Sequence, residues 1–251
     1  MKQVYVYAIA HGEKVDNPAD GVGAASIATF VPKDRALSPL EIRLFVQQME
    51  SVVTYPTIKL ALRLILLTLV RKSELIQATW DEVDFESKTW TIPKQRMKGR
   101  NPHVVYLSSQ ALDIFVTLHA CAAGSRFVFP SRYDAERCMS NATLNRVTQL
   151  VAQAAKTKGL PLQPFTVHDL RRTGSTLLNE IGFNRDWIEK CLAHEDGRSS
   201  RSVYNKAEYA EQRRHMLQEW ANLVVAWGDG KTYIPKLLPK NVVVPALSAA
   251  A

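Results

Sequence analysis

Apolar and polar positions repeat along most of this chain with the period of an amphipathic helix. A helix is predicted to begin after Ser38, because Pro39 takes the first helical position and Glu41 completes a capping box, and to run to about Ser51. A second helix, residues 57–70, is apolar on nearly every side and is expected to be buried. Further helices are predicted at residues 71 to about 80, 109–120, 140–158, 166 to about 181, 185–192 and 200–227, the last broken near residue 206.

The period changes to that of a β-strand at residues 88–92 and again at residues 103–107. Between these two runs lie residues 93–101, which are rich in turn residues and strongly basic. The two runs therefore predict a small hairpin or meander with positive charge at its tip. Together with the helices, this predicts a mainly α fold with a small antiparallel β-sheet, in the α+β class.

Both ends of the chain differ from this central region. Residues 3–11 resemble the end of a short helix, and residues 12–37 have the Pro and Gly content of a linker. A glycine-containing stretch at residues 21–26 resembles a phosphate-binding loop, but no strand precedes it and we expect no nucleotide site there. The chain is thus divided into residues 1–37, a main domain at residues 38–227, and a tail at residues 228–251, which we expect to be loosely attached.

Charge and cysteine content narrow the kind of protein. The 251 residues carry a formal net charge of +8, and the isoelectric point near 9.4 favours a polyanionic partner such as nucleic acid. Three scattered cysteines, Cys121, Cys138 and Cys191, predict neither a disulfide framework nor a metal site. The start lacks the long apolar core of a signal peptide, and the most apolar run is too short to cross a bilayer. We expect a soluble, cytoplasmic protein.

The stretch at residues 166–174 contains the most informative pair of side chains. Thr166 and Asp169 form a predicted capping box, so His168 and Arg171 lie three residues apart on one face of the first helical turns. A guanidinium and an imidazole at the positive end of a helix suit a group with concentrated negative charge. Alternatively, His168 is a buried structural histidine and Arg171 a surface charge.

Four other polar residues stand at predicted element ends: Arg71, Lys98, His194 and Tyr204. Each has a structural alternative, respectively a helix-end charge, a solvated turn residue, a cation that complements a helix dipole, and a half-exposed tyrosine. Combined with the pair above, they supply what metal-free phosphoryl transfer requires. Cations neutralise the phosphate oxygens, a phenol serves as nucleophile, and an ammonium donates a proton to the leaving oxygen. The clustered carboxylates of a two-metal nuclease are missing from the sequence, and we expect neither metal nor other cofactor.

This ordered set resembles the tyrosine recombinases of the phage integrase family, and it is most similar to the integrases of satellite phages and genomic islands. The similarity spans about residues 38–227. The matching segments are residues 66–75, 80–84, 97–108, 168–171, 192–194, 203–206 and 213–220. The resemblance implies the catalytic-domain fold of that family. One departure is Ala193, which stands where many relatives have glycine, and we expect this change to be tolerated.

The resemblance also implies a role for each candidate residue. Arg71 and Arg171 would clamp the scissile phosphate, and Lys98 would be the general acid for the 5′ leaving oxygen. His168 and His194 would handle protons and stabilise the phosphate. Tyr204 would form a 3′-phosphotyrosyl link.

Two further sets of residues are expected near the DNA. Tyr209 is a rival nucleophile, but Tyr204 is preferred because it follows His194 by about the family's usual interval and has more basic neighbours. The candidates for DNA contact are Lys94, Arg96, Arg100 and Arg172.

The implied function is site-specific recombination of DNA, by which a mobile element is integrated or excised. The implied partners are duplex DNA at attachment sites, three further copies of the chain in a tetramer on paired sites, and an accessory excision factor; off DNA the protein could be a monomer. Relatives carry arm-binding and core-binding domains ahead of the catalytic one, and we interpret residues 3–11 as the last helix of a core-binding domain. The alternatives are DNA relaxation by the same chemistry and a truncated, non-catalytic DNA-binding remnant.

Overall fold

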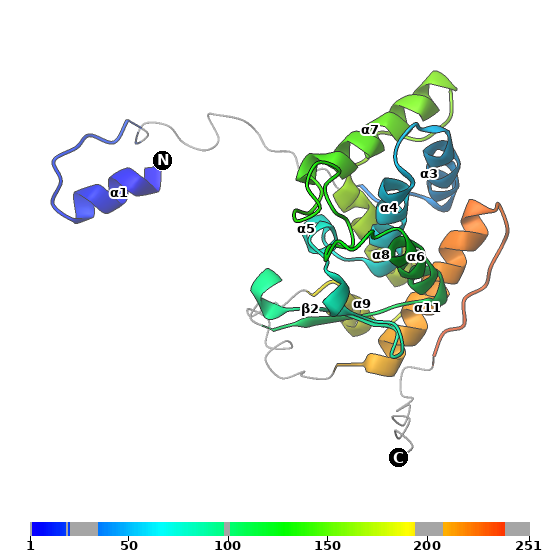
Figure 1. Ribbon diagram of the computed structural model, residues 1–251. Coiled ribbons are helices and arrows are strands. Elements are labelled where there is room, and N and C mark those ends of the chain that lie inside the picture. The colour runs from blue at the N-terminus through cyan, green and yellow to red at the C-terminus, as the bar shows by residue number, and fades with distance from the viewer. Residues whose placement is uncertain (1, 19, 21–34, 98–100, 194–207, 239–251) are drawn as a thin grey trace, which may run out of the picture. The chain divides into compact units, whose positions relative to one another are not determined.

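The computed structural model describes residues 2–18, 20, 35–97, 101–193 and 208–238. The chain divides into two compact units, a smaller one up to Asp34 and a larger one from Arg35 onward. In the smaller unit, α1 (Lys2–Ala10) is a single helix that ends in a turn in which Tyr7 stacks on His11. The larger unit contains the other elements and is described below (Figure 1).

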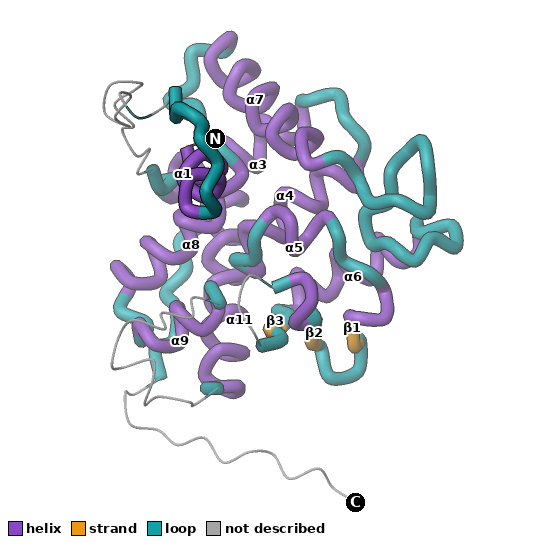
Figure 2. Tube along the Cα trace, turned by 90° about the vertical axis from the view of Figure 1, so that its left-hand side faces the viewer, coloured by secondary structure: helices purple, strands orange, loops and turns teal. Residues whose placement is uncertain are grey.

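The larger unit is mainly helical, as the sequence pattern predicts. Its centre is α4, which packs against α6, α7, α8 and α11, so that helices surround it on several sides (Figures 1 and 2). The helices are α3 (Pro39–Ser51), α4 (Pro56–Thr68), α5 (Lys72–Ile76), α6 (Ser109–Ala120), α7 (Asn141–Thr157), α8 (Val167–Ile181), α9 (Arg185–Cys191) and α11 (Ala210–Gly228).

A three-stranded antiparallel sheet forms one edge of this unit, and its strands β1, β2 and β3 lie side by side in that order (Figure 2). The strands are β1 (Val83–Asp84), β2 (Thr89–Ile92) and β3 (His103–Tyr106), with a 3₁₀ turn before the first, η1 (Trp80–Glu82), and another after the second, η2 (Lys94–Arg96). In the register, Trp90 pairs with both Val83 and Val105. The predicted sheet is therefore confirmed, with a short third strand that the pattern did not indicate.

The apolar core lies between α4 and the helices around it. Leu62, Ile65 and Leu66 of α4 are almost completely buried, as expected for a helix that is apolar on most sides. Trp220 of α11 is also fully buried, and its indole N–H donates to the carbonyl of Leu66 at 2.7 Å. This contact satisfies the one polar group of the indole ring inside the core.

Two predicted helix ends are wrong, and both errors arise next to the site described below. The helix expected over residues 57–70 ends at Thr68, because Leu69 takes a left-handed conformation with φ of 59°. The helix expected from residue 71 to about 80 ends at Ile76, since Thr79 pairs with Phe127 in an isolated β-bridge. Both ends are set by long-range contacts that local pattern does not encode.

The segment after α11 is attached more firmly than we expected. The Glu219 carboxylate accepts hydrogen bonds from the Tyr233 hydroxyl at 3.0 Å and from the Lys236 N–H at 2.7 Å. His215 is hydrogen-bonded to the carbonyl of Lys236. The described part of the tail therefore runs back along α11 (Figure 1, orange to red).

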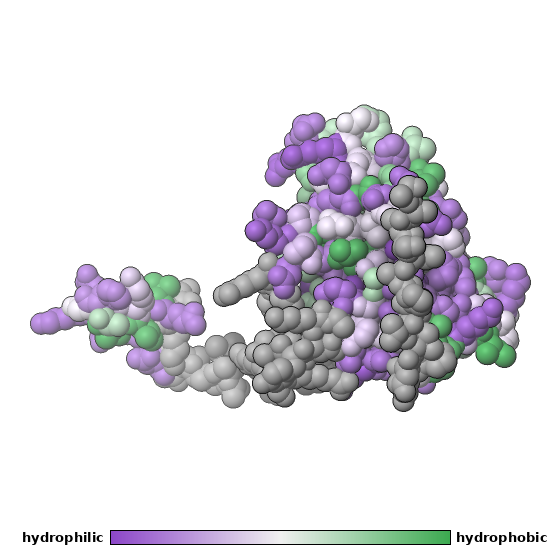
Figure 3. Space-filling view, turned by 90° about the horizontal axis from the view of Figure 1, so that it is seen from below, coloured by the Kyte–Doolittle hydropathy of each residue, from purple (hydrophilic) through white to green (hydrophobic). Residues whose placement is uncertain are grey.

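The surface of the larger unit is mixed in character. Figure 3 looks onto one face and shows hydrophilic and apolar side chains interspersed over the coloured part of it. In the described parts of the chain, each helix is too short or too polar to cross a membrane.

Candidate active site

The first arginine of the site lies where α4 gives way to α5. The chain turns at Leu69, and Arg71 then occupies the N-cap position of α5. The buried carboxylate of Glu74 accepts hydrogen bonds from both the backbone N–H and the Nη1 of Arg71, each at 2.7 Å. Glu74 thereby fixes the direction in which this guanidinium points.

The N-terminus of α8 supplies the second group of side chains. The predicted capping box is confirmed: the Thr166 side chain accepts from the Asp169 N–H, and the Asp169 carboxylate accepts from the Thr166 N–H at 2.7 Å. This box starts the helix one residue before His168, so that His168 and Arg171 fall on the same face of its first turns.

Arg171 is almost completely buried, with 3% of its surface exposed. Its Nη1 donates to the carbonyl of Leu69 and its Nη2 to the carbonyl of Leu192, so one guanidinium joins the end of α4 to the end of α9. Burial, followed by the positive charge of Arg71, lowers the pKa of Arg171 to about 10. The group is therefore still charged at neutral pH.

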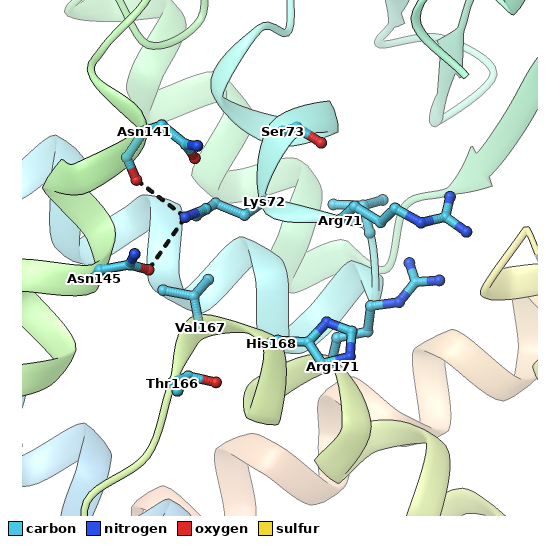
Figure 4. A pocket seen from close by; sticks show the side chains of 10 residues that line it. Arg71, Lys72, Ser73, Asn141, Asn145, Thr166, Val167, His168 and Arg171 are labelled. Atoms are coloured by element: carbon cyan, nitrogen blue, oxygen red, sulfur yellow. Dashed lines mark hydrogen bonds between the residues drawn. The ribbon is translucent and has the colours of Figure 1, made fainter. Parts of the chain in front are cut away.

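Arg71, His168 and Arg171 line a single hollow of about 330 Å³. Figure 4 shows the two guanidinium groups pointing the same way, with the imidazole beside them. Among the described residues that line the hollow there is no aspartate or glutamate. A guanidinium has five N–H donors, and each of these two uses two of them on partners in the described chain, which leaves donors for a ligand. The hollow thus suits a phosphate.

The surroundings of His168 favour its neutral form. Its pKa is lowered, first by partial burial of the ring and then by the charges of Arg172 and Arg171. A neutral imidazole can accept or donate one proton, and an arriving anion would favour the protonated form. His168 can therefore take a proton as a phosphate binds.

The end of α9 closes the site from a third direction. The carbonyl of Ala193 accepts from Nη2 of Arg71 at 3.3 Å, beside the contact between Leu192 and Arg171. Ala193 has a left-handed backbone, with φ of 46°. This conformation is the one that glycine adopts at least cost, so the alanine at this position carries some backbone strain.

The other candidates are distributed as follows. Arg96 folds back on the protein: its guanidinium donates to the carbonyls of Gln77 and Glu74 and lies 3.2 Å from the Glu82 carboxylate. It ties the loop between β2 and β3 to α5. Lys94 is exposed on η2, and Arg172 lies 3.2 Å from the Asp169 carboxylate. Contact of these three with DNA stays a prediction.

Four of the residues that the sequence predicts for the site lie outside the described residues: Lys98, Arg100, His194 and Tyr204. Tyr209 is described: it is half-buried and forms the N-cap of α11, with φ of 51°. The sequence reasoning missed Lys72 and Asn145, which also line the hollow. The sequence did contain a signal for Lys72, because it is a second positively charged residue directly after Arg71.

The fold and a comparison with known proteins together identify the family of this chain. The structure is that of a mainly α protein with a small sheet and a hollow lined by cationic side chains. Residues 35–211 match the model of the phage integrase family, and the chain belongs to that family.

Similar proteins include integrases of prophages and phages. Over 172 residues the chain is 41% identical to prophage integrase IntA of Escherichia coli (strain K12), covering 68% of this chain and 40% of that protein. Over 230 residues it is 30% identical to the integrase of Enterobacteria phage P4, covering 86% of this chain and 51% of that protein. The chain thus spans about half the length of these relatives.

Solved structures with the same fold include two integrases. The Tn1549 transposon integrase in complex with transposon right end DNA has a TM-score of 0.57 at 20% identity, covering 86% of this chain and 75% of that one. A lambda integrase dimer bound to a COC′ core site has a TM-score of 0.55 at 21% identity, covering 82% and 72%. At these identities the match establishes the fold.

Proposed function

We propose that this chain is a DNA strand-exchange enzyme that integrates or excises a mobile element through a 3′-phosphotyrosyl intermediate. The observation that carries the proposal is the convergence of Arg71, His168 and Arg171 on one hollow without a facing carboxylate among its described lining residues. Two of them are held by backbone carbonyls and a buried glutamate, so their positions are set before any ligand arrives.

The chemistry would proceed in two balanced transfers. The phenol oxygen of Tyr204 attacks the phosphorus as its proton passes to His168, the bond to the 5′ oxygen breaks, and Lys98 gives that oxygen a proton. The guanidiniums of Arg71 and Arg171 neutralise the non-bridging oxygens as negative charge builds on them, with His168 and His194 assisting. In the second transfer a 5′ hydroxyl attacks the phosphotyrosine and gives its proton back to Lys98, the bond from phosphorus to the tyrosine oxygen breaks, and His168 returns the proton to the phenol. Because the bond energy is retained in the intermediate, the proposed reaction needs no nucleotide, and the cationic side chains neutralise the charge that a metal ion would otherwise neutralise.

Duplex DNA is the proposed partner. The formal charge of +8 favours a polyanion, and of the two integrases with the same fold, one binds transposon right end DNA and the other a COC′ core site. We also propose that the protein acts in the cytoplasm as a tetramer on paired attachment sites. An accessory excision factor would be a further partner. Residues 38–227 would form the catalytic domain, preceded by a core-binding helix with its linker and followed by the tail.

The test is formation of a covalent adduct. The protein is incubated in EDTA with a pool of nicked suicide duplexes of randomised sequence, and a protein–DNA adduct is sought on a denaturing gel. We expect an adduct with the wild type and with Tyr209→Phe, and none with Tyr204→Phe. An adduct that disappears in Tyr209→Phe and survives in Tyr204→Phe would assign the nucleophile to Tyr209.

One outcome supports the non-catalytic alternative. If the wild type binds duplex DNA but forms no adduct at any salt concentration, the chain is a DNA-binding remnant and the enzymatic proposal fails. Retention of binding by Tyr204→Phe is the control that separates loss of chemistry from loss of affinity.

A further inference from the structure

The hollow has a second cationic end that the proposed chemistry leaves unused. Lys72 follows Arg71 in the chain, yet its side chain extends the opposite way, toward α7 (Figure 4). We propose that Lys72, with Asn145 and Ser73, binds the phosphate next to the scissile one in the same DNA strand. This inference rests on the proposed function, and it adds a positioning subsite to that site.

The Lys72 ammonium is held in place without being neutralised. Its Nζ donates to the carbonyl of Asn141 at 3.1 Å and to the Oδ1 of Asn145 at 3.2 Å, both in the first two turns of α7. Within the described chain no carboxylate lies within ion-pair distance of it, whereas Lys59 and Lys190 are each paired with a glutamate. An ammonium has three N–H donors, and one remains for a ligand.

The neighbouring groups are also donors. Because Asn145 turns its Oδ1 toward the ammonium, its Nδ2 and both of that atom's N–H groups stay available. The Ser73 hydroxyl lines the same hollow and is exposed. A wall that offers several donors and one unneutralised cation is complementary to an anion and to neither a metal ion nor a basic peptide.

Because the two cationic ends belong to one hollow, they indicate which kind of anion it binds. Lys72 and the Arg71–Arg171 pair line one continuous hollow, so a ligand that fills it meets positive charge at both ends. A nucleic acid strand repeats its phosphates at a fixed interval and presents this pattern, whereas a single inorganic phosphate satisfies only one end. Binding the neighbouring phosphate would fix the strand in register while the scissile phosphate reacts.

Salt dependence of binding counts the phosphates that a protein neutralises. Affinity for a duplex of fixed sequence is measured over a range of salt concentrations for the wild type, Lys72→Ala and Lys59→Ala. Loss of one phosphate contact is expected to reduce the slope of log K against log salt by about 0.9 in Lys72→Ala. Lys59→Ala is the matched control, since Lys59 lies on α4 outside the hollow and pairs with Glu50 of α3, and the slope of this variant should equal that of the wild type.

A second variant separates a ligand site from a structural strut between α5 and α7. Asn145→Asp places a carboxylate beside the Lys72 ammonium, so a purely structural pair would be kept or strengthened and DNA affinity would not change. If the pair binds phosphate, the new negative charge opposes it, and we expect affinity to fall at least about tenfold with an unchanged melting temperature.

The outcomes distinguish this inference from the proposed function. Wild-type slopes in Lys72→Ala together with wild-type affinity in Asn145→Asp overturn the subsite, even if the wild type forms a covalent adduct. Changed slope and affinity without any wild-type adduct support the subsite and overturn the enzyme. Failure of the wild type to bind duplex DNA at any salt concentration overturns both.

Discussion

At the scale of single residues, Arg171 lies in an unfavourable electrostatic environment. A nearly fully buried cation loses most of its hydration, and its contacts in the described chain are two backbone carbonyls, which carry no full negative charge. The positive charge of Arg71 lies close enough to lower its pKa further. An anion bound in the hollow would offset this positive charge, so the electrostatics of the site favour a phosphate ligand.

His103 on β3 is a second buried group close to these charges. Burial and the positive charges of Arg213 and Arg171 lower its pKa to about 3, and a hydrogen bond to the backbone of Cys191 acts in the opposite direction. In the unfolded chain its pKa returns to about 6.5. As pH falls below that value, the unfolded state takes up a proton that the folded state excludes, so stability falls with decreasing pH.

We predict that His103→Gln has a shallower dependence of unfolding free energy on pH than the wild type. The single histidine contributes a slope of up to about 1.4 kcal/mol per pH unit between about pH 6.5 and pH 3. Urea unfolding at about pH 7.5 and about pH 5 measures it. Equal slopes in the two proteins would show that His103 is protonated in the folded state.

At the scale of single residues, the sequence predicts those features that depend on residues nearby in the chain. The capping box of Thr166 and Asp169 could be read directly, because its partners are three residues apart. The left-handed turn at Leu69 and the burial of Arg171 could not, since they depend on a contact across 102 residues. The left-handed backbone of Ala193 was not predicted either, and the carbonyl of this residue contacts Arg71, 122 residues away.

Among the elements, the crossing of α8 with the end of α4 decides where the arginines meet. Gly174 lies on the face of α8 that contacts Leu69, and a Cβ atom at this position would overlap a buried methyl group of that leucine. The absence of a side chain lets the two elements approach until Arg171 reaches the Leu69 carbonyl. Glycine within a helix costs about 1 kcal/mol relative to alanine, and here it permits the close approach.

We predict that Gly174→Ala lowers both stability and activity, although alanine is the better helix former. Overpacking should destabilise the protein by about 1–3 kcal/mol, and a shift of Arg171 by about 1 Å should slow adduct formation on the order of 10²-fold. Thermal melting and single-turnover assays measure the two effects. Ser175→Ala, one residue along the same helix, is the control and should change stability by less than about 0.5 kcal/mol.

The element list followed largely from the sequence because helix caps and periodicity are local. Most predicted helices in the described chain start within a residue or two of their observed positions, as for α3 after Ser38 and α9 after Asn184. Sheet pairing was predicted in outline, but β1 has only two residues and too short a pattern to detect. The early end of α5 depends on the bridge between Thr79 and Phe127, which no local rule anticipates.

For the whole molecule, the main departure from expectation is the tail. Glu219 is buried on α11 and accepts hydrogen bonds from Tyr233 and Lys236, so one carboxylate joins the tail to the helix. The hydrophobic pattern after Gly228 is weak, and it therefore predicted loose attachment. It gave no sign of this contact, because hydrogen bonds between polar groups leave no periodic signal in the sequence. Attachment in the described part of the tail therefore depends on a few hydrogen bonds.

We predict that Glu219→Ala releases the tail while the helical core stays folded. Hydrogen bonds to a charged group contribute about 1.5–3 kcal/mol each, so the open state of residues 231–238 should become at least about tenfold more populated. Limited trypsin digestion at Lys231 and Lys236 reports this opening. Glu211→Ala on the same helix is the control, and equal digestion of the two variants would show that Glu219 does not anchor the tail.

The central claim is that Arg171 stabilises the charge that develops on a DNA phosphate in the hollow, and single-turnover adduct formation in EDTA tests it most directly. Arg172→Ala is the matched control, because Arg172 follows in sequence but pairs with Asp169. Thermal melting first establishes that both variants are folded. We predict that Arg171→Ala slows adduct formation at least on the order of 10²–10³-fold and Arg172→Ala by less than about tenfold. A wild-type rate in folded Arg171→Ala would contradict the account.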